Sequence, residues 1–230
     1  MTDKPAAEPA PESSWRPISQ PLERPIRLAV LISGGGTTLT NFLEQIQAGN
    51  LPAEVPLVIA SRGACGGVDL ARRAGLRCEV VERGSFTGAV SFSAAIFDLC
   101  REARVDLVTL AGFLALIQVP DDFAFRVMNI HPALIPAFCG KGFFGAKVHQ
   151  AVLDAGVKVS GCTVHFADDA YDTGPIIMQR TVPVFDSDTV ETLGARVFHE
   201  ECKAIHETIE LYAAGRLKIE GRRVCLVSPL

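Results

Sequence analysis

The 230-residue sequence predicts an α/β protein with a doubly wound, mostly parallel sheet that carries helices on both faces. Near-continuous apolar segments alternate with segments of helical periodicity, which is typical of βαβ units. The apolar segments lack the polar alternation of a half-exposed strand, so both faces of the sheet are expected to be covered. After His131 this pattern changes. The remaining strands are expected to be partly antiparallel and to be followed by a long helix.

The expected elements follow from the spacing of apolar residues along the chain. Residues 1–25 hold six of the fourteen prolines together with Ala, Glu and Ser, so we expect a flexible tail there. Residues 26–230 are expected to form a single domain. Its first strand is apolar except for Arg27, and the first helix repeats apolar residues at helical spacing. The predicted strands cover residues 26–32, 55–60, 77–82, 106–110, 127–131, 159–167 and 176–184, and the predicted helices cover residues 37–48, 90–103, 147–154 and 189–212.

Charge and cysteine usage argue against several classes of function. Lysine plus arginine total 22 and aspartate plus glutamate total 26, and no basic run is present, so nucleic acid is not expected as a partner. No apolar stretch approaches the ~20 residues that cross a bilayer, so no membrane partner is expected. The chain opens without a leader pattern and its seven cysteines form no CxxC pair, which predicts a cytoplasmic protein with reduced thiols. The five histidines lack zinc-ligand spacing, so no metal is expected.

A glycine-rich loop, Gly34-Gly35-Gly36-Thr37-Thr38, joins the first strand to the first helix. The start of that helix offers free N–H groups and a partial positive charge, and the threonines add hydroxyl groups. Leu39 stands where the dinucleotide fingerprint needs a glycine, and no Walker phosphate-binding motif occurs. The loop therefore indicates a single phosphate group. A plain glycine-rich turn without a ligand is the alternative.

Polar side chains converge where the strand at residues 127–131 ends. Asn129 and His131 are two residues apart, so their side chains share one face at the carboxyl end of a parallel strand, where open α/β sheets bind ligands. His165 lies on the polar face of the next expected strand, and Asp172 lies in a loop that reaches toward the same crevice.

This group has the chemistry for acyl transfer without a covalent intermediate. Asn129 would donate to a developing oxyanion, and His131 would stabilise that charge as imidazolium and protonate the leaving nitrogen. Asp172 would favour the charged imidazole and raise its pKa. The alternative is that both histidines are ordinary half-buried side chains and that Asp172 caps a turn.

Four motifs in the chain resemble those of the folate-dependent formyltransferases. They are residues 33–39 (SGGGTTL), 111–113 (AGF), 129–136 (NIHPALIP) and 172–175 (DTGP), and the resemblance runs from residue 26 to about residue 218. It implies a Rossmann-like formyltransferase fold. It also implies an enzyme of purine biosynthesis that transfers the formyl group of 10-formyltetrahydrofolate to the amine of glycinamide ribonucleotide. In that family the amine attacks the formyl carbon directly, with no metal and no acyl-enzyme.

The resemblance also implies roles for individual residues. Asn129, His131 and Asp172 match the catalytic residues of the family. Both substrates are small molecules, bound by a phosphate-binding N-terminal half and a folate-binding, catalytic C-terminal half of one domain in a monomer or homodimer. The ribonucleotide site is implied at Gly35, Gly36, Thr37, Thr38 and Glu201, and the folate site at Leu114, Ala115, Leu116, Ile117, Asn129, His165, Asp168 and Asp169.

The chain departs from the family's pattern at three places. Ala89 and Ala115 stand where the family commonly carries arginine, so fewer positive charges would meet the glutamate tail of the folate. Residues 138–145 form a longer loop than the family's usual one and contain Lys141. Residues 37–38 are Thr-Thr where Ser-Asn is commoner, which retains a hydroxyl group.

Three other functions fit part of the pattern. Formyltetrahydrofolate deformylase shares the Asn, His and Asp, but it carries an N-terminal regulatory domain and lacks a phosphate-holding glycine loop. Methionyl-tRNA formyltransferase needs a basic surface and a C-terminal domain, and only 18 residues follow Tyr212. A non-catalytic phosphometabolite-binding module on the same fold would have no use for Asn129, His131 and Asp172 together.

Overall fold

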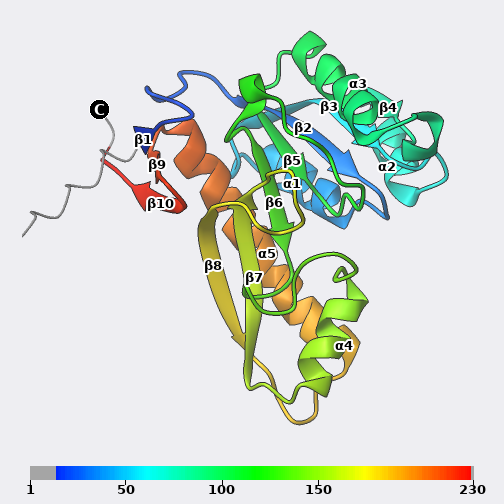
Figure 1. The fold of residues 1–230 in the computed structure, drawn as a ribbon, viewed down its shortest axis with the longest axis vertical. Helices are drawn as coiled ribbons and strands as arrows, with labels where there is room; N and C mark the ends of the chain where they lie inside the picture. Colours follow the sequence, from blue (N-terminus) through cyan, green and yellow to red (C-terminus); the bar gives the residue numbers. More distant parts are fainter. Residues whose placement is uncertain (1–13, 229–230) are drawn as a thin grey trace, which may run out of the picture.

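The structure, a computed structural model, describes residues 14–228. Its centre is a seven-stranded sheet with the order β4-β3-β2-β5-β6-β7-β8 (Figure 1). The strands from β4 to β6 pair in parallel, and β7 and β8 each pair antiparallel with the strand before them. The strands of this sheet are β2 (Ile26–Ile32), β3 (Ala53–Ala60), β4 (Cys78–Val80), β5 (Leu107–Leu110), β6 (Val127–His131), β7 (Val159–Phe166) and β8 (Ile176–Pro183).

Helices and a second, smaller sheet surround these strands. Within the described range the α-helices are α1 (Thr37–Gln47), α2 (Gly66–Arg73), α3 (Ala89–Glu102), α4 (Ala146–Asp154) and the long α5 (Val190–Ala213). Short 3-10 turns lie at η1 (Arg83–Ser85) and η2 (Asp121–Phe123). The small sheet has the order β1-β9-β10 and consists of β1 (Ser14–Trp15), β9 (Leu217–Glu220) and β10 (Arg223–Leu226).

This architecture confirms the predicted fold class, including the antiparallel C-terminal strands and the long final helix. Each predicted strand and helix has a counterpart whose ends differ by no more than one or two residues. Two features were not predicted individually. α2 begins with two glycines and carries three charged residues in a short span, which conceals its helical periodicity, and β9 and β10 are only four residues long.

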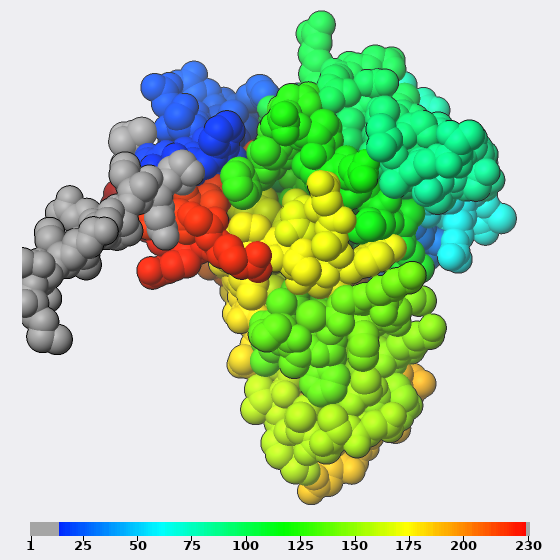
Figure 2. Space-filling view, in the orientation of Figure 1, coloured from blue at the N-terminus to red at the C-terminus, as the bar shows by residue number. Residues whose placement is uncertain are grey.

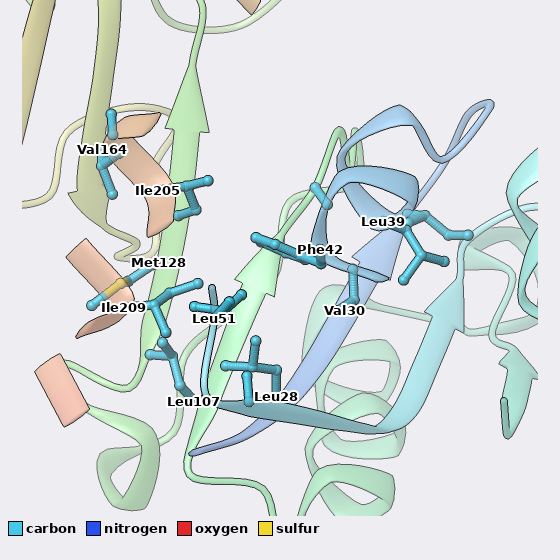
Figure 3. Packing of buried hydrophobic residues seen from close by; sticks show 14 of the residues in the cluster. Leu28, Val30, Leu39, Phe42, Leu51, Leu107, Met128, Val164, Ile205 and Ile209 are labelled. Atoms are coloured by element: carbon cyan, nitrogen blue, oxygen red, sulfur yellow. The ribbon is translucent and has the colours of Figure 1, made fainter. Parts of the chain in front are cut away.

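Both faces of β2 are buried, as a near-continuous apolar strand requires. Leu28 and Val30 pack in one cluster with side chains of α1 and α5, while Ala29 and Leu31 pack in a second cluster with side chains of α3. Figure 3 shows Leu28 and Val30 beside Phe42 of α1. Because successive residues of a strand point to opposite faces, this alternation fixes helices on both sides of the sheet.

The antiparallel extension projects away from the parallel sheet. In Figure 2 the yellow-green surface formed by β7, β8 and α4 is a lobe below the rest of the molecule. α5 packs against both β7 and β8 and also contacts α4. This arrangement brings the carboxyl end of β6 between the parallel sheet and the lobe. Among residues 14–228, no helix combines the length and the apolar composition that crossing a bilayer requires.

The structure describes only part of residues 1–25, the segment expected to be a flexible tail. Residues 1–13 lie outside the described residues. From residue 14 onward the chain lies against the domain: Trp15 pairs with Ile219 of β9, and the Leu22 N–H donates to the carbonyl of Ala213 over 2.9 Å. Arg24 makes a two-bond ion pair with Asp106 at 2.7 and 2.8 Å. Residues 14–25 therefore differ from the expectation, because backbone pairing and this carboxylate hold them.

Candidate active site

The end of β6 carries the centre of the candidate site. Register places Asn129 opposite His165 of β7, and the Asn129 amide donates to His165 Nε2 over 3.0 Å and to Asp172 Oδ1 over 3.2 Å. His165 Nδ1 lies 2.8 Å from the carbonyl oxygen of Phe166. A carbonyl can only accept, so the proton of His165 is on Nδ1 and Nε2 is free to accept from Asn129. Asn129 is thus held in one orientation by two partners.

His131 and Asp172 are tied to the loop at residues 138–145. His131 Nε2 lies 2.9 Å from the carbonyl oxygen of Phe138, and the Gly140 N–H donates to Asp172 Oδ2 over 2.8 Å. His131 Nδ1 and Asp172 Oδ2 are 3.6 Å apart. Phe138 and Asp172 both adopt positive φ angles, 50° and 57°. Such backbone conformations are uncommon for residues with a side chain and often occur at functional sites.

Burial dominates the pKa of His131. It lowers the pKa of the imidazole below its usual value, and the charge of Asp172 and the hydrogen bond to Phe138 offset this only in part. The expectation that Asp172 raises the pKa of His131 is confirmed in direction, but desolvation of the buried cation outweighs the attraction of the carboxylate, so the pKa is lowered overall.

The pKa of Asp172 is shifted by opposing causes. Burial raises the pKa of this carboxyl group, but the side chain of His165, the charge of His131 and the N–H of Gly140 outweigh burial and lower it. At neutral pH the site consequently combines a neutral His131 with an ionised Asp172.

A cleft of about 790 Å³ opens above this group. That volume lies within the usual range for a small-molecule site. Lys141 is the single lysine or arginine among the described residues that line it, against four carboxylates. Of the predicted site residues, those that line the cleft are Thr37, Thr38, Leu114, Ala115, Leu116, Ile117, Asn129, His131, His165, Asp168, Asp172 and Glu201.

One end of the cleft lies at the start of α1. Gly36 is the residue before this helix, has a φ of 82°, and provides no side-chain cap for the first turn. A Cβ on Gly36 would come within 3.1 Å of Gly67 in α2, so this glycine is needed for packing as well as for the turn. Gly35 and Gly36 do not line the cleft themselves, whereas Thr37 and Thr38 do.

Glu201 of α5 is a half-buried carboxyl group in the same cleft. Burial raises its pKa to about 7, and no cation or hydrogen bond among the described residues lowers it again. A carboxyl group with a perturbed pKa and no protein partner, in a cleft, is a candidate for contact with a ligand.

Another part of the cleft wall is formed by the segment after β5 and the loop after β7. The Leu114 N–H donates to the hydroxyl of Ser33 over 2.9 Å, which fixes the start of the apolar segment at residues 114–117. Asp169 does not line the cleft, although the resemblance implies that it belongs to the folate site. Its carboxylate instead accepts the Val119 N–H over 3.0 Å. Tyr171 also lines the cleft, and its hydroxyl lies 3.4 Å from the Leu114 carbonyl oxygen.

Several lining residues were not predicted from the sequence. Tyr171 is adjacent to the Asp-x-Gly-Pro motif, which was a usable signal. Phe198 lies three residues before Glu201 on α5, and His149 lies on α4, which precedes the predicted strand of His165. Neither of these two stands in a recognisable motif. Among residues 14–228, no group of three or more His, Cys, Asp or Glu side chains has the arrangement of a metal site.

Comparisons with known proteins agree with this geometry. Residues 26–209 match the model of the formyl transferase family. The chain is 39% identical over 209 residues to the chloroplastic phosphoribosylglycinamide formyltransferase of Vigna unguiculata, a match that covers 90% of this chain and 67% of that protein. It is also similar to the crystal structure of glycinamide ribonucleotide transformylase 1 from Symbiobacterium toebii, with a TM-score of 0.81, 40% identity, and coverage of 90% of this chain and 96% of that chain.

A more distant likeness concerns the fold alone. A formyltetrahydrofolate deformylase from Pseudomonas syringae pv. tomato has a TM-score of 0.78 at 20% identity, covering 90% of this chain and 67% of that chain.

Proposed function

The chain belongs to the formyl transferase family, and from this premise we infer that it transfers a formyl group to the amine of glycinamide ribonucleotide in purine biosynthesis. The observation that carries this function is the group Asn129, His131 and Asp172 on one side of a cleft large enough for two small substrates. We propose 10-formyltetrahydrofolate as the formyl donor, and a cytoplasmic monomer or homodimer as the working form. Residues 26–230 are proposed to act as a single domain.

The acceptor is proposed to bind between α1 and α5. Its phosphate would meet the first-turn N–H groups of α1 and the hydroxyls of Thr37 and Thr38, since a helix start favours an anion. Glu201 would accept a hydrogen bond from the ribose or the amine end of the same substrate. Its lack of a protein partner supports this role.

The folate is proposed to bind where the segment after β5 and the loop after β7 form the cleft wall. Residues 114–117 supply an apolar wall with backbone groups for the pterin ring, and Asp168 lies on the other side. Asp169 would act indirectly, because its carboxylate holds the Val119 N–H just beyond that wall. His165 would hold Asn129 in place for the formyl group, as its hydrogen bond in the structure suggests.

The chemical step needs one new bond and one broken bond. The acceptor amine attacks the formyl carbon, and the carbonyl oxygen becomes an oxyanion as the C–N bond forms. Asn129 is proposed to share with this oxyanion the N–H that donates to Asp172 over 3.2 Å, while its other N–H stays on His165. Asp172 faces His131 across 3.6 Å, and protonation of His131 then stabilises the charge.

Proton movement completes the step. The attacking nitrogen loses a proton, and the folate nitrogen gains one as its bond to the formyl carbon breaks. His131 is proposed to carry this proton, because a neutral imidazole beside an ionised carboxylate can take a proton up and pass it on. No covalent enzyme intermediate is required.

An assay with and without the acceptor tests this function. Purified protein and 10-formyltetrahydrofolate are incubated with or without glycinamide ribonucleotide, and release of tetrahydrofolate is followed spectrophotometrically. The proposal expects release that depends on the ribonucleotide and is lost in Asn129→Ala. Release at the same rate with water alone would identify a deformylase instead, and binding of the ribonucleotide without any release would favour a non-catalytic module.

A further inference from the structure

His149 is a buried side chain in the cleft with no role in the mechanism above. It lies on α4, is only 8% exposed, and lines the same cleft as Asn129, His131 and Glu201. Its Nδ1 is buried and has no hydrogen-bond partner among residues 14–228. A buried polar atom left unpaired costs about 1–3 kcal/mol, so such an atom calls for an explanation.

The ring of His149 is fixed by a glycine of the neighbouring helix. A Cβ on Gly194 of α5 would lie 3.1 Å from Cδ2 and 3.3 Å from Nε2 of His149. Any other residue at position 194 would therefore press on this edge of the ring. Both Gly194 and His149 line the cleft.

The position of Gly194 relates His149 to the proposed acceptor site. Gly194 and Glu201 are seven residues apart on α5, which places them on the same helix face about 10 Å apart. Phe198 lies between them and also lines the cleft. The proposed folate end is built from other segments, at residues 114–117 and 168–171. His149 therefore packs on the helix that carries Glu201 of the proposed acceptor site.

The protonation state of His149 indicates what kind of ligand group it can bind. Burial lowers the pKa of this imidazole, and the nearby His131 lowers it further. At neutral pH the ring is uncharged and offers one N–H donor and one acceptor lone pair. Such a group suits a hydroxyl or an amide, which both donate and accept, better than it suits a phosphate.

We propose that His149 is a specificity residue for the acceptor, hydrogen-bonded through its imidazole to an uncharged polar group of the ribonucleotide, either a ribose hydroxyl or the glycinamide amide. This inference rests on the proposed function, because it deepens the acceptor site of the same reaction. Gly194 serves it as a positioning residue.

The test uses His149→Ala, His149→Gln and Gly194→Ala, with Gln150→Ala as a matched control on the exposed side of α4. Loss of one neutral hydrogen bond should raise the KM for glycinamide ribonucleotide about three- to tenfold in His149→Ala. Gly194→Ala should raise it similarly because it displaces the ring. His149→Gln should restore most of the affinity, and kcat and the KM for the folate should stay within about twofold in all variants.

Several results would overturn the proposal. An unchanged ribonucleotide KM in both His149→Ala and Gly194→Ala contradicts it, as does an equal rise in the folate KM. A loss of melting temperature without a change in KM would assign His149 to packing alone. If His149→Ala does not fold, the comparison of Gly194→Ala with Gln150→Ala decides.

Failure of the underlying function is recognised separately. In that case the wild-type protein shows no turnover that depends on the ribonucleotide. Calorimetric titration of the ribonucleotide into wild type and into His149→Ala then still measures whether His149 contributes to binding. Equal Kd values in the two proteins would contradict the proposed contact.

Discussion

The centre of the cleft and its end at α1 differ in how their polar groups are paired. At the paired end, which comprises Asn129, His131, His165 and Asp172, each of these side chains has a partner within the protein. At the open end, which comprises Thr38, His149, Glu201 and the start of α1, the groups lack such partners: α1 has no side-chain cap, Nδ1 of His149 is unpaired, and burial alone sets the pKa of Glu201.

This difference assigns catalysis to the paired end and binding of the acceptor to the open end. Internal hydrogen bonds hold the paired end in position before a substrate arrives, which is what stabilising a transition state requires. The open end leaves groups without partners in the protein, and a bound ligand can supply those partners. Substitutions at the paired end should therefore lower kcat, and substitutions at the open end should raise the KM for the acceptor.

The largest effect is expected from Asn129→Ala. Removing one donor to an oxyanion typically lowers kcat by about 10²–10³-fold. Steady-state kinetics on both substrates measure this change. His165→Gln, which keeps a side-chain acceptor for Asn129, serves as the comparison and should lose less activity. A kcat within a few fold of wild type in Asn129→Ala would remove the distinction between the two ends.

The next largest effect concerns pH and Glu201. Its pKa of about 7 means that it is mostly ionised at pH 8 and mostly protonated at pH 6. Since the carboxylate is the form that accepts hydrogen bonds with full charge, the KM for the acceptor should rise about tenfold from pH 8 to pH 6. Glu201→Gln should flatten this profile. Titration of the substrate itself affects the KM of both proteins equally, so the difference between their KM–pH profiles reports Glu201 alone. Parallel profiles would contradict its role.

A smaller effect is expected from Thr38→Ala. One hydroxyl contact to a phosphate is lost, while the N–H groups of α1 remain. The KM for the ribonucleotide should rise about three- to tenfold with kcat and the folate KM unchanged. Thr38→Ser retains the hydroxyl and should behave like wild type. A shift in folate affinity instead would mean that the two substrates occupy the cleft in the opposite order.

The smallest effect is on stability. Burial raises the pKa of Glu201 above its usual value, so the folded state disfavours the carboxylate and loses stability as the pH rises from about 4.5 through about 7. A rise from 4.5 to about 7 would correspond to ~3 kcal/mol for a fully buried carboxyl group, but Glu201 is half-buried and solvent reduces this to ~1 kcal/mol. Glu201→Gln should therefore melt about 2–4 °C higher than wild type at pH 8. The gain should vanish near pH 4, where both states hold the proton. Calorimetric scans at the two pH values measure it.

The parallel sheet and the paired end could be predicted from the sequence because their signals are local. Buried parallel strands require near-continuous apolar segments, and the strand ending in Asn129 and His131 displays both side chains on one face. The antiparallel pairing of β6 with β7 then brings His165 opposite Asn129.

Properties that arise from packing could not be predicted from the sequence. The lowered pKa of His131 reflects its burial under the loop at residues 138–145, which spacing does not reveal. His149 depends on Gly194, 45 residues away on another helix. The pairing of Trp15 with β9 likewise joins the two ends of the described chain.

Calorimetric binding of glycinamide ribonucleotide to Asn129→Ala and to Glu201→Gln at pH 8 tests the separation of the two ends most directly. We expect a Kd within about threefold of wild type for Asn129→Ala, although its turnover is lost, and a Kd weakened about tenfold for Glu201→Gln. Loss of binding in Asn129→Ala together with wild-type binding in Glu201→Gln would contradict it.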